Sequence, residues 1–281
     1  TIMSLFYAYH FNPTIFKDGF LQIPESGNGI PDILDEAKWE LDWLLKMQRA
    51  DGAVHHKATT ANYPYVVPWE SKETLYIFNV STQVTAHFAA IMAEASIVYQ
   101  SINKEYAGRL LQAAEKAWNW LEKNKEQYPK GGFRNPLDEN GKQTTGGPYY
   151  VEEDQENELR LWAAAALFKA TNNGKYNDAF LNYWNITKQT HNYGMSEYDG
   201  FAFALFTYLN TEQGNNDIKN NIKSLIKKRC EKIIEVTDRS AFHVALKSRT
   251  YGFSYNWGSN GYTLQHAQFL LLTNEIIPDQ R

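Results

Sequence analysis

The sequence predicts an all-α fold in which buried helices alternate with half-exposed helices, as they do in an α/α barrel. Apolar residues recur at a helical period in about nine segments of the 281-residue chain. Two segments, 80–101 and 156–172, are rich in alanine and apolar on most of their circumference, which is typical of helices packed on several sides. Two others, 108–124 and 215–236, are amphipathic. We therefore expect an inner set of helices covered by an outer set.

The first expected helix spans 2–11 and the second spans 31–49, where Pro31 suits the first helical turn. Asp32, Asp35 and Glu36 follow Pro31. Their position at the positive end of the helix dipole explains these acids without a catalytic role. The later helices are expected at 80–101, 108–124, 156–172, 174–189, 199–209, 215–236 and 259–275.

Two long loops, 50–79 and 126–155, interrupt the helices and are rich in Gly, Pro, Tyr and Asn. Loops of this length without regular structure are uncommon and tend to carry function. No change in composition marks a linker, so we expect one domain. An α-solenoid is the alternative architecture, although no repeat of roughly 33–47 residues with a shared signature occurs.

Charge and cysteine content exclude several classes of protein. The net charge is −4 and the pI is about 6.0, and the short basic run 227–229 lies in an expected helix, so no nucleic-acid partner is expected. Cys230 is the only cysteine, which excludes an intramolecular disulfide and a thiolate zinc cluster. No apolar run is long enough to span a membrane, and residues 1–7 lack the features of a signal peptide. These first residues are typical of the middle of a helix.

Aromatic residues make up 15% of the chain, with 8 Trp, 18 Tyr and 15 Phe. Flat aromatic faces can stack on sugar rings, so this content favours a carbohydrate cleft, although core packing also uses aromatic side chains. Five tryptophans within expected helices are assigned to the core: Trp39, Trp43, Trp118, Trp120 and Trp162. His55 and His56 are adjacent, which is poor geometry for joint metal ligation, so no zinc site is expected. The motifs of nucleophile-elbow hydrolases, phosphate loops and zinc proteases are absent.

Five sequence blocks lie in order along the chain: 23–37 (IPESGNGIPDILDEA), 51–57 (DGAVHHK), 80–86 (VSTQVTA), 162–171 (WAAAALFKAT) and 257–260 (WGSN). Together they resemble glycoside hydrolase family 9, the family of many cellulases and endoglucanases. The resemblance covers essentially the whole chain. It implies an (α/α)6 barrel, incomplete here with about nine of twelve helices, and residues 1–281 as one partial catalytic domain truncated at both ends.

The family resemblance also implies an activity, the inverting hydrolysis of β-1,4-glucosidic bonds in cellulose or related β-glucans. This chemistry needs a general acid and a general base roughly 6.5–9.5 Å apart. In the family the base belongs to an Asp-Ala-Gly-Asp motif and the acid is a Glu in a C-terminal acidic segment, and this chain contains neither motif. We therefore expect no catalytic residue within the chain, and an inactive, poorly stable protein when it is isolated.

The resemblance places His56 in the substrate cleft, hydrogen-bonded to a glucosyl unit, and makes Trp257 a platform on which a sugar stacks. Tyr255, Tyr149 and Tyr150 are lesser candidates of the same type. A purely structural role stays open for His56, and core packing stays open for Trp257. The substrate is expected to be a β-glucan or an oligosaccharide, and the full-length form is expected to be monomeric and secreted or periplasmic.

The acidic run 152–158 is interpreted as solvated charge that favours the start of a helix. No cofactor is required, and a structural calcium ion stays open, although the spacing matches no EF-hand loop. Leu159 and Ala166 stand where the family often has acids, which puts a local ion site in doubt.

Three alternatives to the cellulase interpretation remain open. An exo-acting glucosaminidase of the same family would differ in the loop 126–155. A non-catalytic carbohydrate-binding barrel would lack the acids altogether. A polysaccharide lyase would need a basic subsite for uronates, which the net charge of −4 does not favour.

Overall fold

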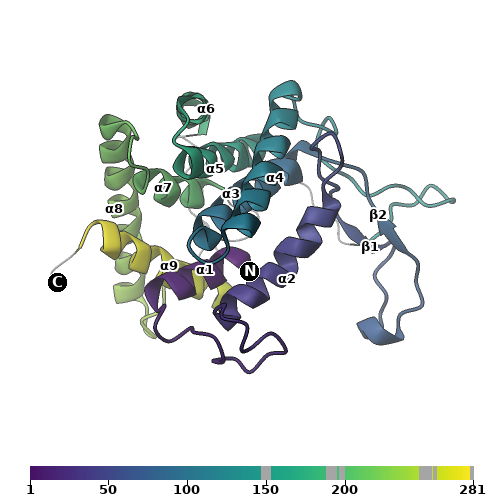
Figure 1. The fold of residues 1–281 in the computed structure, drawn as a ribbon, viewed down its shortest axis with the longest axis horizontal. Coiled ribbons are helices and arrows are strands. Elements are labelled where there is room, and N and C mark those ends of the chain that lie inside the picture. The colour runs from purple at the N-terminus through teal and green to yellow at the C-terminus, as the bar shows by residue number, and fades with distance from the viewer. Residues whose placement is uncertain (147–152, 188–194, 196–199, 247–254, 256–257, 279–281) are drawn as a thin grey trace.

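The computed structural model describes residues 1–146, 153–187, 195, 200–246, 255 and 258–278 (Figure 1). Over these residues the regular structure is mostly α-helical, which confirms the all-α prediction. The helices are α1 (Ile2–Phe11), α2 (Asp32–Met47), α3 (Thr82–Tyr99), α4 (Lys104–Lys123), α5 (Glu153–Thr171), α6 (Gly174–Thr187), α7 (Phe201–Leu209), α8 (Asn216–Arg239) and α9 (Ser259–Ile276). Within the described ranges, none of these helices is both long and apolar enough to cross a lipid bilayer.

The odd-numbered helices form the inner set, and each even-numbered helix covers the helix that precedes it. Helix α3 packs against α4 and α5, and α5 packs against α6 and α7 (Figure 1). The alanines of α3 and the run Ala163–Ala166 of α5 are buried, and their small side chains allow close approach of the helix axes. Phe206 of α7 meets Phe269 of α9 at a ring-centroid distance of 5.1 Å. The expected alternation of inner and outer helices is therefore confirmed.

The inner helices run in the same direction, so their N-terminal ends meet at one end of the molecule. Thr82 at the start of α3 reaches Glu156 in the first turn of α5. Gly200, just before α7, lies against the backbone of Glu158 and Leu159 of α5. The N-terminal ends of α3, α5 and α7 are thus gathered on one rim, where the helix dipoles present their positive ends.

The loop between α1 and α2 is organised by two buried acids at the start of α2. Asp32 accepts hydrogen bonds from Gly19 N (2.9 Å), Leu21 N (2.6 Å) and the Ser26 hydroxyl (3.0 Å). Asp35 accepts from the Asn28 side chain. The prediction that helix-dipole effects fully explain these acids was therefore wrong, because distant loop residues are their partners.

The long loop 50–79 also differs from its prediction, because it contains regular structure. Strand β1 (Ala58–Thr60) pairs antiparallel with β2 (Leu75–Ile77), and a 3₁₀ turn, η1 (Pro68–Glu70), lies between them. This arm extends away from the helices (Figure 1). A three-residue strand is too short for its side-chain alternation to be recognised in a sequence.

The assignment of all five helical tryptophans to the core was wrong for two of them. Trp118 and Trp162 are buried as expected, and Trp120 is half-buried. Trp39 is 78% exposed and Trp43 is 45% exposed. The buried stripe of α2 runs through Leu34, Ala37 and Leu41. At about 100° per residue, positions 39 and 43 point away from that stripe.

Candidate functional site

A cavity of about 740 Å³ opens between the N-terminal turns of α1, the C-terminal half of α2, α3 and α9. His55 and His56 line it from the segment that follows α2, and Met195 and Phe203 line it from the α7 side. Ligand pockets in proteins measure roughly 300–1,000 Å³, so the cavity is large enough for sugar rings. His56, which the resemblance assigned to a substrate cleft, is one of the residues that line this cavity.

His56 is held tightly within this wall. Its backbone N–H donates to Asn79 O (2.9 Å), and its ring stacks on Phe133 with centroids 3.8 Å apart and an interplanar angle of 6°. Its Nδ1 lies 2.9 Å from the hydroxyl oxygen of Ser81, the N-cap of α3. That oxygen accepts the Val84 N–H as a cap, so its own proton can be donated to Nδ1. In this arrangement Nε2 carries the proton and serves as a donor.

The surroundings of His56 keep its imidazole neutral. Burial, and then the charge of Lys57, lower the pKa of His56 to about 4. At neutral pH the ring therefore has one donor and one acceptor nitrogen. Ser81 occupies the acceptor nitrogen Nδ1, so the Nε2–H is the group from which a sugar hydroxyl can accept a hydrogen bond.

Lys57 ties together the two long loops next to His56. Its Nζ donates to Asn135 Oδ1 (2.6 Å) and Gly146 O (2.5 Å), and it lies 4.8 Å from the ring centroid of Phe78. Burial lowers the pKa of Lys57 to about 8. The sequence showed the His-Lys pair, but nothing in it identified Asn135 or Phe133 as partners, because both belong to the other loop.

The inner wall of the cavity is aromatic. Trp162 stacks on Phe203 with ring centroids 4.7 Å apart, and His87 contacts Trp162 at 5.6 Å. Burial lowers the pKa of His87 to about 4, so a second neutral imidazole lines the space. Sequence reasoning missed His87. Its only signal was a histidine directly before the apolar run Phe88–Ala93 of α3.

The described structure does not bring the other residues assigned to the cleft next to His56. Tyr255 is 57% exposed and lines a separate hollow of about 290 Å³ with the last turns of α8. Trp257, Tyr149 and Tyr150 lie outside the described residues. The assignment of these four residues to the substrate cleft stays a prediction.

The acidic run was predicted to be solvated, and this was wrong for Glu156 and Glu158, which are 2% and 1% exposed. Arg160 lies one helical turn after Glu156 and pairs with it, which allows a carboxylate to stay buried. Among the described residues no three His, Cys, Asp or Glu side chains are grouped closely enough to hold a metal ion.

The described lining of the cavity does not contain the pair of carboxyl groups that an inverting glycosidase uses. Of the described residues that line the cavity, Glu40 is the only carboxylic acid. Glycoside hydrolysis with inversion needs two such groups on opposite faces of the sugar. The described lining is therefore suited to binding and orienting a sugar, and lacks the pair that would cleave it.

Comparison with known proteins identifies a family and several relatives. The model of Glycosyl hydrolase family 9 matches residues 1–280. Endoglucanase D of Acetivibrio thermocellus is 29% identical over 99% of this chain and 43% of its own length. A cellodextrinase of Butyrivibrio fibrisolvens is 44% identical over 54% of this chain and 26% of its own. The crystal structure of a metagenome-derived family 9 endoglucanase superposes with a TM-score of 0.85 and 29% identity, over 99% of this chain and 48% of that one. The chain thus spans less than half the length of these relatives.

Proposed function

The chain belongs to glycosyl hydrolase family 9, and we propose that the whole protein hydrolyses β-1,4-glucosidic bonds of cellulose or a related β-glucan with inversion. The observation that carries this proposal is the neutral His56, which stacks on Phe133 at the wall of a cavity large enough for sugar rings. The relatives named as endoglucanases and a cellodextrinase support the same substrate class. A polymer of this kind cannot enter a cell intact, so we also propose a secreted or periplasmic location.

In this proposal the chain binds and orients the sugar. The Nε2–H of His56 donates to a sugar hydroxyl, and the aromatic wall around Trp162 excludes water from one side of the ring. Trp257, Tyr255, Tyr149 and Tyr150 are retained as proposed stacking positions. The general base and the general acid are supplied by family segments that this chain does not contain. The positive helix ends gathered on the rim favour a carboxylate there, which is the form that a general base needs.

The test is equilibrium binding of cellotetraose to the 281-residue chain, measured by calorimetry or by tryptophan fluorescence. We expect binding that is weakened about tenfold by His56→Ala, because one hydrogen bond and one packed ring are lost. His10→Ala is the matched control, since His10 lies at the far end of α1 and pairs with Glu275 on α9. Chitosan oligosaccharides of the same length test the glucosaminidase alternative.

The same samples test the assignment of the catalytic pair. We expect no release of reducing sugar from a soluble β-glucan, because the described residues that line the cavity do not include two opposed carboxylates. Hydrolysis by the isolated chain would show that the assignment of the acid and base to other segments is wrong. If His56→Ala bound cellotetraose as tightly as the wild type does, His56 would not belong to the binding site.

A further inference from the structure

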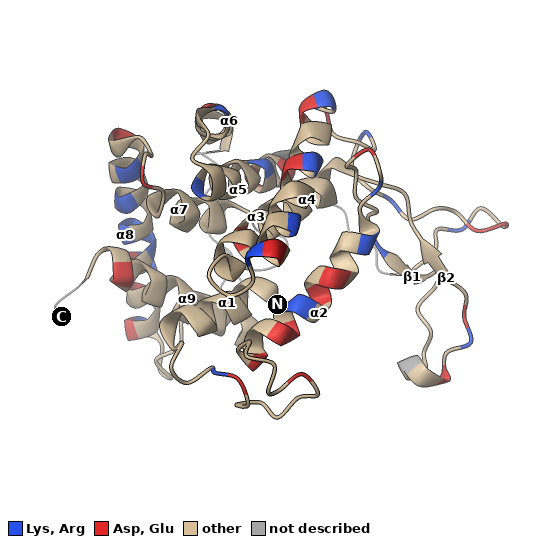
Figure 2. Cartoon of the chain, in the orientation of Figure 1, with Lys and Arg blue, Asp and Glu red and all other residues tan. Residues whose placement is uncertain are grey.

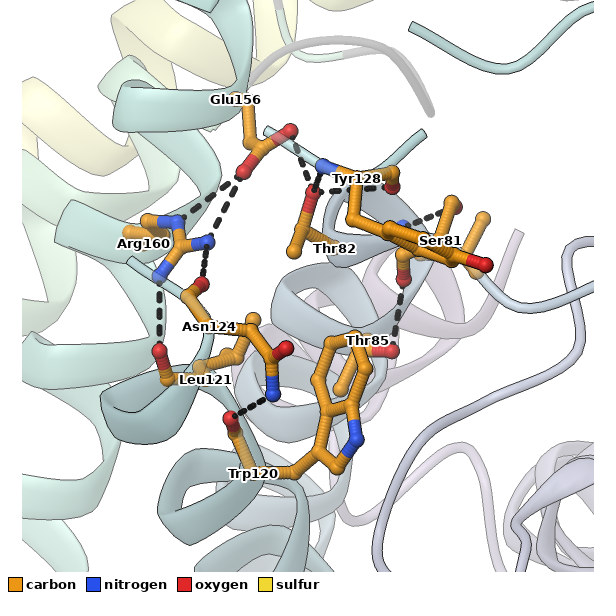
Figure 3. Close-up of polar contacts among 10 residues, drawn as sticks. Ser81, Thr82, Thr85, Trp120, Leu121, Asn124, Tyr128, Glu156 and Arg160 are labelled. Atoms are coloured by element: carbon orange, nitrogen blue, oxygen red, sulfur yellow. Dashed lines mark hydrogen bonds and ion pairs between the residues drawn. The ribbon is translucent and has the colours of Figure 1, made fainter. Parts of the chain in front are cut away.

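A buried polar network runs from the end of α4 through α5 to the start of α3 (Figure 3). Ser81, at that start, contacts His56. We propose that the Glu156–Arg160 pair is a positioning element, which holds both neighbours of the His56 ring, Ser81 and Phe133, in place. The binding of a sugar by His56 rests on the proposed function. The positioning itself concerns protein atoms alone, so it can be tested separately.

The first link joins α5 to α4. Arg160 Nη2 and Nε lie 3.0 and 3.1 Å from Glu156 Oε1, and both side chains are almost fully buried. Arg160 also donates to Asn124 O (2.8 Å) and Leu121 O (3.4 Å) at the end of α4, where the helix dipole favours a cation (Figure 3). A buried ion pair is retained where further hydrogen bonds satisfy its remaining atoms. These carbonyl contacts meet that condition for Arg160.

The second link joins α5 to the start of α3. The Thr82 hydroxyl donates to Glu156 Oε2 over 2.8 Å and accepts the N–H of Tyr128 over 2.9 Å. The backbone N–H of Thr82 in turn donates to Tyr128 O over 2.8 Å. Thr82 is therefore bound to α5 on one side and to the loop that follows α4 on the other (Figure 3).

The third link reaches His56 by two routes. Ser81 directly precedes Thr82, and its hydroxyl contacts His56 Nδ1 at 2.9 Å. Tyr128 belongs to the same loop as Phe133, on which the His56 ring stacks at 3.8 Å. The hydrogen-bond partner of the imidazole thus directly precedes Thr82, and its stacking partner lies in the loop that Thr82 binds through Tyr128. A shift of Thr82 would change the hydrogen bond and the stacking together.

A purely structural role for the network would lower stability without changing His56. The discriminating readout is therefore the ring of His56 itself, followed by ¹⁵N NMR of the histidine side chains in the 281-residue chain. The His56 signals are assigned by their loss in His56→Gln. The ring nitrogen shifts report the tautomer and the pKa, and neither measurement needs a sugar.

Thr82→Val removes the hydroxyl and keeps the shape of the side chain. We expect the pKa of His56 to rise from about 4 toward 6.5 and the Nδ1 shift to move, because the ring loses its enclosure. Thr82→Ser, which keeps the hydroxyl, should restore both values. The matched control is Tyr176→Phe, which also removes one hydroxyl–carboxylate hydrogen bond, from Tyr176 to Glu115 (3.0 Å), between α6 and α4. It should leave His56 unchanged.

Glu156→Gln provides a second variant that keeps an oxygen for Thr82 and removes the charge opposite Arg160. The expected shift of the His56 pKa has the same direction and is smaller. The proposal is overturned if the His56 signals in Thr82→Val and Glu156→Gln equal those of the wild type. It is equally overturned if Tyr176→Phe moves them as far. If Thr82→Val does not fold, Glu156→Gln alone decides between these outcomes.

Cellotetraose binding separates this proposal from the proposed function. Thr82→Val should bind about fivefold more weakly, as expected for the loss of one modest hydrogen bond. If the His56 signals move as expected while the wild-type chain binds no cellotetraose, the positioning role stands and the proposed function fails. If the wild type binds and Thr82→Val binds equally well with unchanged His56 signals, the proposed function stands and the positioning role is refuted.

Discussion

Replacement of Gly200 by alanine tests the packing that brings the inner helices together at the rim of the site. Gly200 has φ −100° and ψ −28°, a conformation that alanine adopts freely, so the backbone itself is not strained. An added Cβ would lie 2.5 Å from the carbonyl carbon and oxygen of Glu158 and 2.6 Å from the Leu159 nitrogen. The cost of the substitution is therefore entirely steric.

The size of that cost follows from what the methyl group would meet. Its neighbours are backbone atoms in the second turn of α5, which cannot rotate aside, so α7 and α5 must separate by about 1 Å to relieve the overlap. Overpacking of this kind costs about 1–3 kcal/mol, and the rigid backbone places Gly200→Ala near the upper end. For a chain of this size we expect a melting temperature lower by about 6 °C.

Gly108→Ala is the matched control, because it adds the same methyl group inside α4, where nothing lies within 4 Å. Alanine is the better helix former, so this change should raise the free energy of unfolding by about 0.5–1 kcal/mol. Urea unfolding followed by circular dichroism measures both variants. The close approach of α7 to α5 would be refuted if Gly200→Ala unfolded at the urea concentration of the wild type while Gly108→Ala behaved as expected.

Two further predictions concern charge and core packing. Three histidines have pKa values lowered to about 4 by burial, below the 6.5 of an unfolded chain: the buried His56 and His266 and the half-buried His87. The unfolded state therefore binds protons that the folded state excludes. The stability that the three neutral rings contribute is fully present above pH 6.5 and is lost as the pH falls toward 4. At pH 5 the free energy of unfolding should be lower by up to about 2 kcal/mol for each ring. Equal urea midpoints at pH 7 and pH 5 would contradict this prediction. Trp162→Ala should lower the free energy of unfolding by about 3–5 kcal/mol, because a fully buried ring is removed, whereas Trp39→Ala should change it by less than about 0.5 kcal/mol. A large loss of stability in Trp39→Ala would show that the outer face of α2 is covered.

The helices could be predicted closely because their signals are local. The expected helix 259–275 corresponds to Ser259–Ile276, and the expected 80–101 corresponds to Thr82–Tyr99. Periodicity, N-caps such as Ser81 and Asn215, and apolar stripes all act within a few residues. The family resemblance also rests on short contiguous blocks, which a sequence displays directly.

The burial predictions failed where the environment of a side chain depends on how the helices pack. Glu156 belongs to a run of acids that is typical of a solvated helix start, yet Thr82, 74 residues away, and Arg160 keep it buried. Trp39 was assigned to the core because it lies within an expected helix, although the geometry of that helix turns it outward. In each case the position relative to other helices decided the outcome.

The sequence by itself determined the helical elements, their alternation between buried and half-exposed, and the family to which the chain belongs. It also marked His56, because that residue lies in a recognisable block. Only the tertiary structure decided what His56 touches: Ser81 lies 25 residues away and Phe133 belongs to a different loop. Helix formation depends on neighbours along the backbone. The hydrogen bond, the stacking and the burial that keep this imidazole neutral depend on the order in which the helices pack.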